Sequence, residues 1–195
     1  MIIGISSETE NRNESATIQK LLCGGMDLFH IRKYNYSDKM LVDLTEKIDR
    51  KFRDRLVLHS HFHLAKKLQI NRLHINEKTR KVGFEFAHSE FIYSTSVHSI
   101  EDFNQLSSNW KYAFLSPVFP SISKKGYGID KNVFEEIKNR TNAAVRLIGL
   151  GGVQQENYKK LRNQGADGAA LLGSIWQHPY PLKTIKKCKQ IDQLF

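Results

Sequence analysis

Two glycine-bearing segments near the end of the chain could hold a phosphate group. Gly151-Gly152 closes one apolar run, and Gly173-Ser174 closes the next apolar run along the chain. Glycine has no side chain, so backbone N–H groups can approach phosphate oxygens closely at such positions. Tight turns alone would also use glycine, and the spacing is not that of a dinucleotide fingerprint. Because both pairs follow neighbouring predicted strands, we expect Gly151, Gly152, Gly173 and Ser174 to bind phosphate.

A third candidate for anion binding is the loop from Ser116 to Gly126. Its hydroxyl and ammonium groups on Ser121, Ser123 and Lys124 could donate hydrogen bonds to phosphate oxygens. An exposed polar loop without a ligand would have the same composition. The residues alone leave both interpretations open.

Histidine supplies the candidate group for proton transfer. His98 directly follows a predicted strand, and imidazole can take up and return a proton near neutral pH. A single histidine is more often structural, so the assignment depends on the motif around it. We treat His98 as the candidate acid/base group.

The segment His59-Ser-His-Phe-His63 raises the question of a metal site. On an extended strand, alternate residues share one face, so His59, His61 and His63 could converge on a cation. A metal-dependent hydrolase would add His and Asp ligands from later strands, and no convincing Asp partner is present. We therefore expect no metal.

Short apolar runs and helical stretches alternate along the whole chain, which predicts an α/β fold. The predicted strands are Ile2–Ser6, Asp27–Arg32, Leu56–His59, Arg72–Ile75, Glu90–Ser94, Tyr112–Ser116, Ala144–Gly149 and Gly168–Leu172. The predicted helices are Ala16–Leu22, Asp38–Phe52, His63–Leu68, Ser99–Leu106, Asn132–Lys138, Gln155–Gln164 and Leu182–Gln193, with Glu77–His88 the least regular stretch.

Eight strands that alternate with helices fit a small (β/α)8 TIM barrel, with an open doubly wound sheet as the alternative. The 195 residues are fewer than the ~250 of a typical barrel, so we expect one compact domain over residues 1–195. In such a barrel, the loops after strands seven and eight commonly bind phosphate, and Gly151-Gly152 and Gly173-Ser174 fall in those loops.

Composition limits the partners and the location of the protein. The formal net charge is +10, but the basic residues are scattered and no nucleic-acid-binding motif accompanies them, so nucleic acid is an unlikely partner. No apolar run reaches the roughly 18 residues of a membrane span, and no secretory leader is recognisable. Cys23 and Cys188 have no disulfide or metal-site spacing. We expect a cytoplasmic protein.

Five short motifs, taken in order, resemble the thiamine-phosphate synthase and thiazole tautomerase superfamily of small (β/α)8 barrels. They are Phe29–Lys33, Thr95–Ser99, Ser116–Lys124, Gly149–Gly152 and Gly165–Gly168. The resemblance implies a small phosphorylated thiazole as substrate, with Gly152, Gly173 and Ser174 on its phosphate. It also matches Ser121, Ser123 and Lys124 to the synthase loop that contacts phosphate and pyrophosphate. A homodimer is implied as well.

At several positions this sequence departs from the synthase pattern. The synthase uses Mg²⁺ to neutralise leaving pyrophosphate. Its Asn-Asp after strand three is His59-Ser60 here, and its second metal-binding Asp corresponds to Thr79. Its Glu-Lys after the strand-two Arg is replaced by Lys33-Tyr34, so the lysine that binds pyrophosphate is displaced or absent. In the register of this family His59 ends strand three, whereas His61 and His63 enter the following helix.

These departures favour the tautomerase branch, which needs only a proton transfer on a carboxythiazole phosphate. By the resemblance, His98 is the acid/base group, Arg32 binds the substrate carboxylate bidentately, and His30 and His59 are further substrate contacts. No cofactor is expected in this case. The alternative is a divergent thiamine-phosphate synthase that requires Mg²⁺. A second alternative is a non-catalytic barrel that binds a phosphate ligand or nucleic acid.

Overall fold

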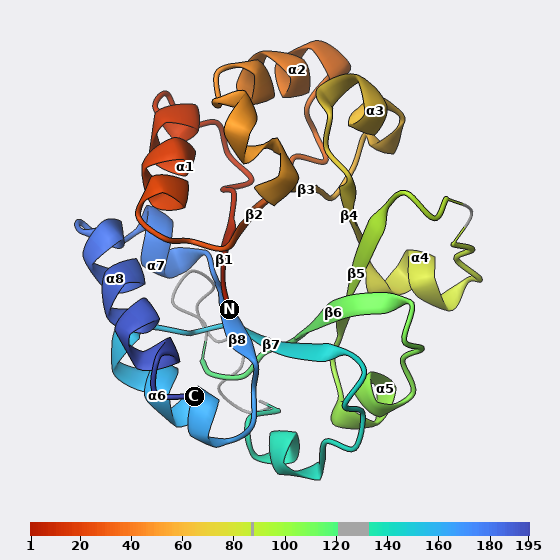
Figure 1. Cartoon of the computed structure of the whole chain (residues 1–195), viewed down its shortest axis with the longest axis vertical. Helices are drawn as coiled ribbons and strands as arrows, with labels where there is room; N and C mark the ends of the chain where they lie inside the picture. Colours follow the sequence, from red (N-terminus) through yellow and green to blue (C-terminus); the bar gives the residue numbers. More distant parts are fainter. Residues whose placement is uncertain (87, 121–132) are drawn as a thin grey trace.

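The structure is a computed structural model that describes residues 1–86, 88–120 and 133–195. Within these ranges the strands form one closed parallel barrel in the order β1 to β8, with helices outside it (Figure 1). The strands are β1 Ile2–Ile5, β2 Leu28–Ile31, β3 Leu56–Leu58, β4 Arg72–Ile75, β5 Ile92–Val97, β6 Trp110–Leu115, β7 Arg146–Leu150 and β8 Gly168–Leu171. The prediction of a small (β/α)8 barrel is confirmed, and the open-sheet alternative is wrong.

Burial on both faces explains why the strands are nearly continuous apolar runs. All residues of β1, β2, β3 and β8 are buried, as parallel sheets covered by helices require. Side chains that alternate along the strands divide into an outer layer under the helices and an inner group inside the barrel. The inner group contains Ile3, Ile5, Leu28, Val57, Tyr112, Phe114, Ile148 and Ala170.

Several helices outside the barrel are shorter than the sequence predicts. It consists of α1 Glu14–Cys23, α2 Asp38–Glu46, η1 Arg50–Arg55, η2 Phe62–Leu64, α3 Ala65–Leu68, α4 Glu77–Lys81, α5 Ile100–Asn104, η3 Glu135–Asn139, α6 Gln155–Asn163, α7 Gly173–Trp176 and α8 Pro181–Asp192, where η marks a 3₁₀ helix. The predicted helix Asp38–Phe52 is two elements, because the Asp49 side chain accepts from Lys51 N–H and starts η1. Strand β5 begins later than predicted, where Ile92 N–H bonds Asn71 O.

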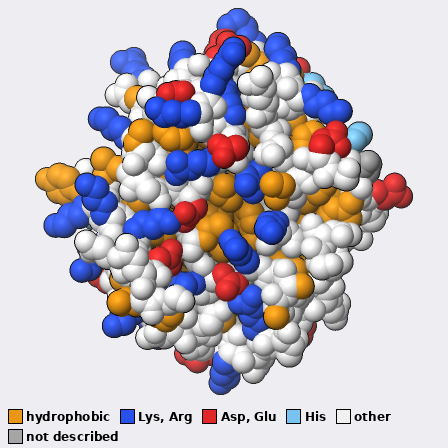
Figure 2. All heavy atoms as spheres, viewed as in Figure 1, with side chains coloured by type: hydrophobic (Ala, Val, Ile, Leu, Met, Phe, Trp, Pro, Cys, Tyr) orange, Lys and Arg blue, Asp and Glu red, His pale blue; other side chains and the backbone are white. Residues whose placement is uncertain are grey.

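The basic residues do not form one continuous patch on the face shown in Figure 2. Lys and Arg side chains alternate there with acidic, apolar and neutral groups. This distribution fits the expectation of charged, solvated helix surfaces. In the described ranges, no helix combines the length and the apolar character needed to cross a membrane.

A buried ion pair ties the first helix to the second strand. Lys33 Nζ lies 2.7 Å from Glu14 Oε2, with side chains 0% and 2% exposed. The same ammonium group donates to Thr9 O at 3.0 Å. Burial raises the pKa of Glu14, although Lys33 opposes the shift. Lys33 is thus held inside the structure and is not offered to a ligand.

Replacing Lys33 by Met should destabilise the fold by about 3–5 kcal/mol, because Glu14 would remain buried without its partner. Lys39→Met is the matched control, since Lys39 pairs with Asp43 at the exposed surface and should contribute less than about 1 kcal/mol. Urea unfolding at pH 7 measures both changes. Equal effects of the two substitutions would contradict the structural role of Lys33.

Candidate active site

A cavity of about 800 Å³ opens at the carboxyl ends of the strands, the end at which barrel enzymes carry their active sites. Residues following all eight described strands line it: Ser7, Arg32, His59, Asn76, His98, Ser116, Gly151 and Gly173. Barrel closure therefore brings together groups that lie far apart in the sequence.

His98 is held with one ring nitrogen available. Its Nδ1 lies 2.8 Å from Ser116 O, and a carbonyl oxygen can only accept a hydrogen bond. Nδ1 therefore carries the proton, and Nε2 has the lone pair in neutral His98. The side chain is 50% exposed, and Nε2 lies 3.8 Å from Glu77 Oε2. His98 lines the cavity with the geometry of a proton acceptor.

The two predicted phosphate loops meet beside the segment that follows β6, where Phe119 N–H donates to Gly151 O. Gly151, Gly152 and Gly173 line the cavity, and Gly151 and Gly152 have φ angles of 100° and 63°. Ser174 does not line the cavity in the described residues, because its buried hydroxyl donates to Val153 O and joins the two loops. The Ser174 hydroxyl is therefore engaged within the protein. Ser121, Ser123 and Lys124 lie outside the described residues.

Arg32 lies at the cavity mouth, where it is paired with a residue of opposite charge. Its guanidinium group forms an ion pair with Glu8, and the side chain is 30% exposed. Both residues line the cavity. A carboxylate ligand would have to compete with Glu8 for the guanidinium group.

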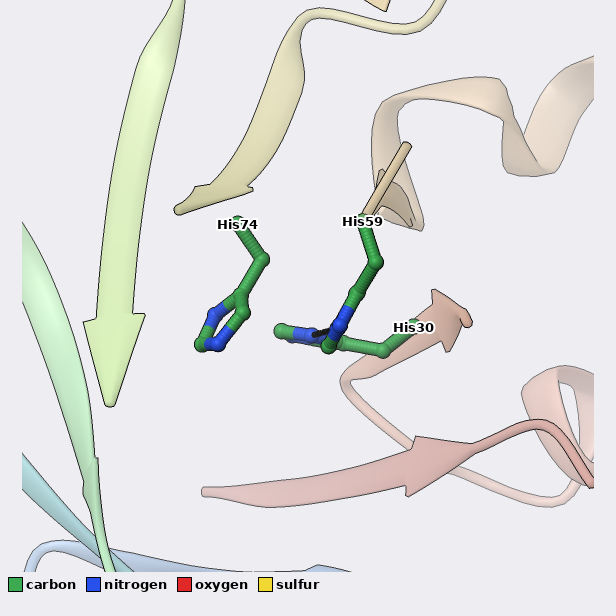
Figure 3. A group of neighbouring side chains, drawn as sticks. All are labelled: His30, His59 and His74. Carbon is green, nitrogen blue, oxygen red and sulfur yellow. Dashed lines mark hydrogen bonds between the residues drawn. The ribbon is translucent and has the colours of Figure 1, made fainter. Parts of the chain in front are cut away.

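Three histidines from adjacent strands meet in the floor of the cavity (Figure 3). They are His30 on β2, His59 after β3 and His74 on β4. His30 Nδ1 lies 2.7 Å from His59 Nε2, and the rings of His59 and His74 stack with centroids 4.2 Å apart. His59 and His74 line the cavity, whereas His30 lies beneath them.

Hydroxyl groups surround this cluster. His30 Nε2 lies 2.7 Å from Tyr112 Oη, and the two ring nitrogens of His74 each lie 2.9 Å from a serine hydroxyl, Ser94 and Ser96. Desolvation lowers the pKa of all three histidines, and that of His74 falls to about 3. The rings are therefore neutral at pH 7.

The sequence prediction missed this arrangement in part. It named His30 and His59 but not His74, although Arg72-Leu-His-Ile75 alternates so that His74 points into the barrel. His59, His61 and His63 do not share one extended face, because the chain turns at His61 into η2, close to the helix that the family register predicts there. His61 and His63 contact the Tyr36 carbonyl and Asp38 instead.

The family to which the chain belongs follows from its match to one family model. The model described as thiamine monophosphate synthase matches residues 1–175 of this chain. The chain belongs to the thiamine monophosphate synthase family. It is 25% identical over 198 aligned positions to a thiamine-phosphate synthase of Bacteroides fragilis, covering 96% of this chain and 97% of that protein. It is 23% identical over 173 residues to the one from Clostridium tetani, covering 85% and 82%.

Solved structures show the same fold. A thiamine phosphate pyrophosphorylase from Bacteroides thetaiotaomicron aligns with a TM-score of 0.80 and 24% identity, covering 99% of this chain and 98% of that one. One from Pyrococcus furiosus aligns with a TM-score of 0.76 and 14% identity, covering 99% and 95%. The chain belongs to a family of thiamine-biosynthesis enzymes. The names of these relatives support the synthase alternative rather than the tautomerase expected from the sequence.

The described lining of this cavity does not fit Mg²⁺, which prefers oxygen ligands such as carboxylates. Among the described lining residues, the carboxylates are Glu8 and Glu77. Glu8 pairs with Arg32, and Glu77 lies 3.1 Å from Lys81 Nζ. At the positions of the synthase aspartates, Ser60 donates to Lys33 O, and Thr79 is exposed in α4.

Gly152→Ala tests the wall formed by the phosphate loops. A Cβ at Gly152 would lie 2.1 Å from Pro120 O, and φ is positive there. Gly83→Ala is the matched control, because Gly83 also has positive φ but nothing within 4 Å of its Cβ. Gly152→Ala should cost about 1–3 kcal/mol more than the control, as measured by urea unfolding. Equal costs would show that the loops are not packed as described.

The histidine cluster should make stability depend on pH in a defined direction. The three pKa values are lowered from 6.5 in the unfolded chain, so below pH 6.5 the unfolded state binds protons that the folded state excludes. Stability therefore does not depend on these groups above that pH and declines as pH falls below it, by up to about 1.4 kcal/mol per pH unit and histidine.

Urea unfolding between pH 7 and pH 5, with a chelator present, measures this slope. His74→Gln should reduce it by the contribution of one histidine. A slope that is the same in His74→Gln as in the wild type would contradict the burial of neutral His74.

Proposed function

We propose that this protein acts on a thiazole phosphate in the cavity and transfers a proton on its ring, as a tautomerase that does not need Mg²⁺. The observation that carries the proposal is the orientation of His98. Its Nδ1–H is fixed on the Ser116 carbonyl, and Nε2 is left as the base. A proton-transfer enzyme needs one such group within reach of the substrate.

Each of the other groups then has a role in binding. The phosphate binds to the backbone at Gly151-Gly152 and at Gly173, where side chains do not block the approach. Arg32 exchanges Glu8 for the substrate carboxylate, and His59 contacts the ring from the floor of the cavity. His98 Nε2 takes a proton from one ring position, and the same proton returns at another, so the ring becomes aromatic with no change in composition.

The second candidate function is thiamine-phosphate synthesis, and the comparisons favour it. The curated relatives described above carry the name thiamine-phosphate synthase. That reaction joins a pyrimidine pyrophosphate to the thiazole phosphate and releases pyrophosphate. The absence of unpaired carboxylates among the described lining residues is the reason why we rank it second.

Both reactions should be assayed on the purified protein, with Mg²⁺ and with a chelator. We expect isomerisation of the carboxythiazole phosphate that a chelator specific for Mg²⁺ does not abolish. His98→Gln should lower turnover by about 10²–10⁴-fold, while substrate affinity changes little. His88→Gln, at an exposed histidine, is the matched control and should retain full activity.

Other results would reject the tautomerase. Mg²⁺-dependent release of pyrophosphate without isomerisation would establish the synthase instead. Binding of thiazole phosphate without either reaction would indicate a non-catalytic carrier, and unchanged isomerisation in His98→Gln would remove His98 from the mechanism.

A further inference from the structure

The three histidines in the cavity floor form an unusual group for a barrel interior. Each side chain is at most 6% exposed, and each takes a place that an apolar residue could occupy at lower cost, since burying polar groups is unfavourable unless they are fully hydrogen-bonded. Neither proposed reaction uses His30 or His74. The two proposed reactions therefore do not explain why the three histidines lie together.

The sheet register explains how the rings come together. His30 pairs with Val57 in β3, which places it two residues below the level of His59. Leu58 pairs with Leu73, so His59 and His74 stand side by side on β3 and β4. Two imidazoles thus lie at the cavity floor with the third below them (Figure 3), and their ligand nitrogens all lie within 4.8 Å of one another.

We infer that His30, His59 and His74 form a binding site for a transition-metal ion of the Zn²⁺ class, with one coordination position open to the cavity. Three imidazoles and an exchangeable fourth ligand are a typical donor set for such an ion. Nitrogen ligands select against Mg²⁺, which prefers oxygen ligands.

Coordination requires His74 to rotate out of its stack on His59 and to give up one of its two serine hydrogen bonds. Imidazole nitrogens at about 2.0–2.1 Å from a tetrahedral zinc lie roughly 3.4 Å apart. The His30–His59 contact of 2.7 Å must open slightly, and His74 must move toward it. The proton that these two nitrogens share in the absence of metal must move to the other nitrogen of its own ring when the ion binds, and both rings stay neutral.

The outer hydrogen bonds match the tautomers that a metal requires. When His30 Nδ1 ligates the ion, Nε2 carries the proton and donates it to Tyr112 Oη, 2.7 Å away. One nitrogen of His74 can likewise donate to Ser94 or Ser96 while the other ligates. Outer partners of this kind fix the orientation of ligating histidines in metal sites.

The charge of the site defines the ligand at the open position. Three neutral histidines leave the two positive charges of the ion uncompensated, and Arg32 at the mouth is neutralised by Glu8. An anionic oxygen, from a carboxylate or from hydroxide, is therefore the fourth ligand that the site favours. This assignment does not depend on which reaction the protein catalyses.

Metal uptake by the whole protein, without substrate, tests the inference. After removal of metals with a chelator, we expect about one equivalent of Zn²⁺ per chain by equilibrium dialysis. Co²⁺ in its place should give the intense visible absorption of a four-coordinate ion, and excess Mg²⁺ should displace neither. Folded wild-type protein that binds no Zn²⁺ would overturn the site.

Matched glutamine variants locate the bound ion. His59→Gln and His74→Gln should lose the equivalent of Zn²⁺ and the Co²⁺ absorption, whereas His63→Gln, at an exposed histidine paired with Asp38, should keep both. Loss of metal in His63→Gln, with retention in His74→Gln, would place the ion at the surface and reject the inference.

Tyr112→Phe provides a second route in case the buried histidine variants do not fold, as judged by circular dichroism. It removes only the hydroxyl that accepts from His30, and should weaken Zn²⁺ binding by about 10–100-fold. Unchanged Zn²⁺ affinity in folded Tyr112→Phe would also reject the site. Since none of these measurements uses substrate, their outcome is separate from that of the proposed reaction.

Discussion

Closure of the barrel between β8 and β1 is the constraint on which the rest of the structure depends. Ile2 pairs with Ala169 and Gly4 with Leu171, so the last strand completes a ring that the first began. The contact is close: a Cβ at Gly168 would lie 1.9 Å from Met1 O, and only glycine can stand there. Once the ring is closed, all strand ends face one cavity, which the phosphate loops after β7 and β8 share with His98.

Much of this architecture could be predicted from the sequence, because a parallel strand buried on both faces is readable as a short apolar run. The strand ends near Arg32, His59 and Gly151 follow from that pattern, and so does the placement of His98 after β5. The helices outside the barrel are harder to predict from the sequence. Helices as short as α3 and α4 are stabilised by packing rather than by their own sequence, so their lengths and the 3₁₀ geometry of η1 leave no reliable periodic signal.

The cavity floor shows the other limit of sequence reasoning. His30 and His59 stood out by their motifs, but His74 acquires meaning only when the register sets β4 beside β3. Alternation along the strand predicts that His74 points inward, yet it cannot say which side chains it meets there. Lys33 illustrates the converse: the sequence shows a lysine after a predicted strand, and only the fold shows that it is buried against Glu14 with a structural role.

The hydrogen bonds from His59 through His30 to Tyr112 have a direction, and that direction can be reversed. In neutral rings, a proton on His59 Nε2 obliges His30 to accept at Nδ1 and to donate from Nε2 to Tyr112; a proton on His30 Nδ1 obliges Tyr112 to donate instead. A molecule in the cavity that accepts from the remaining nitrogen of His59 selects one arrangement, and a molecule that donates selects the other. The direction in which the Tyr112 hydroxyl points therefore depends on whether the molecule in the cavity accepts a hydrogen bond from His59 or donates one to it.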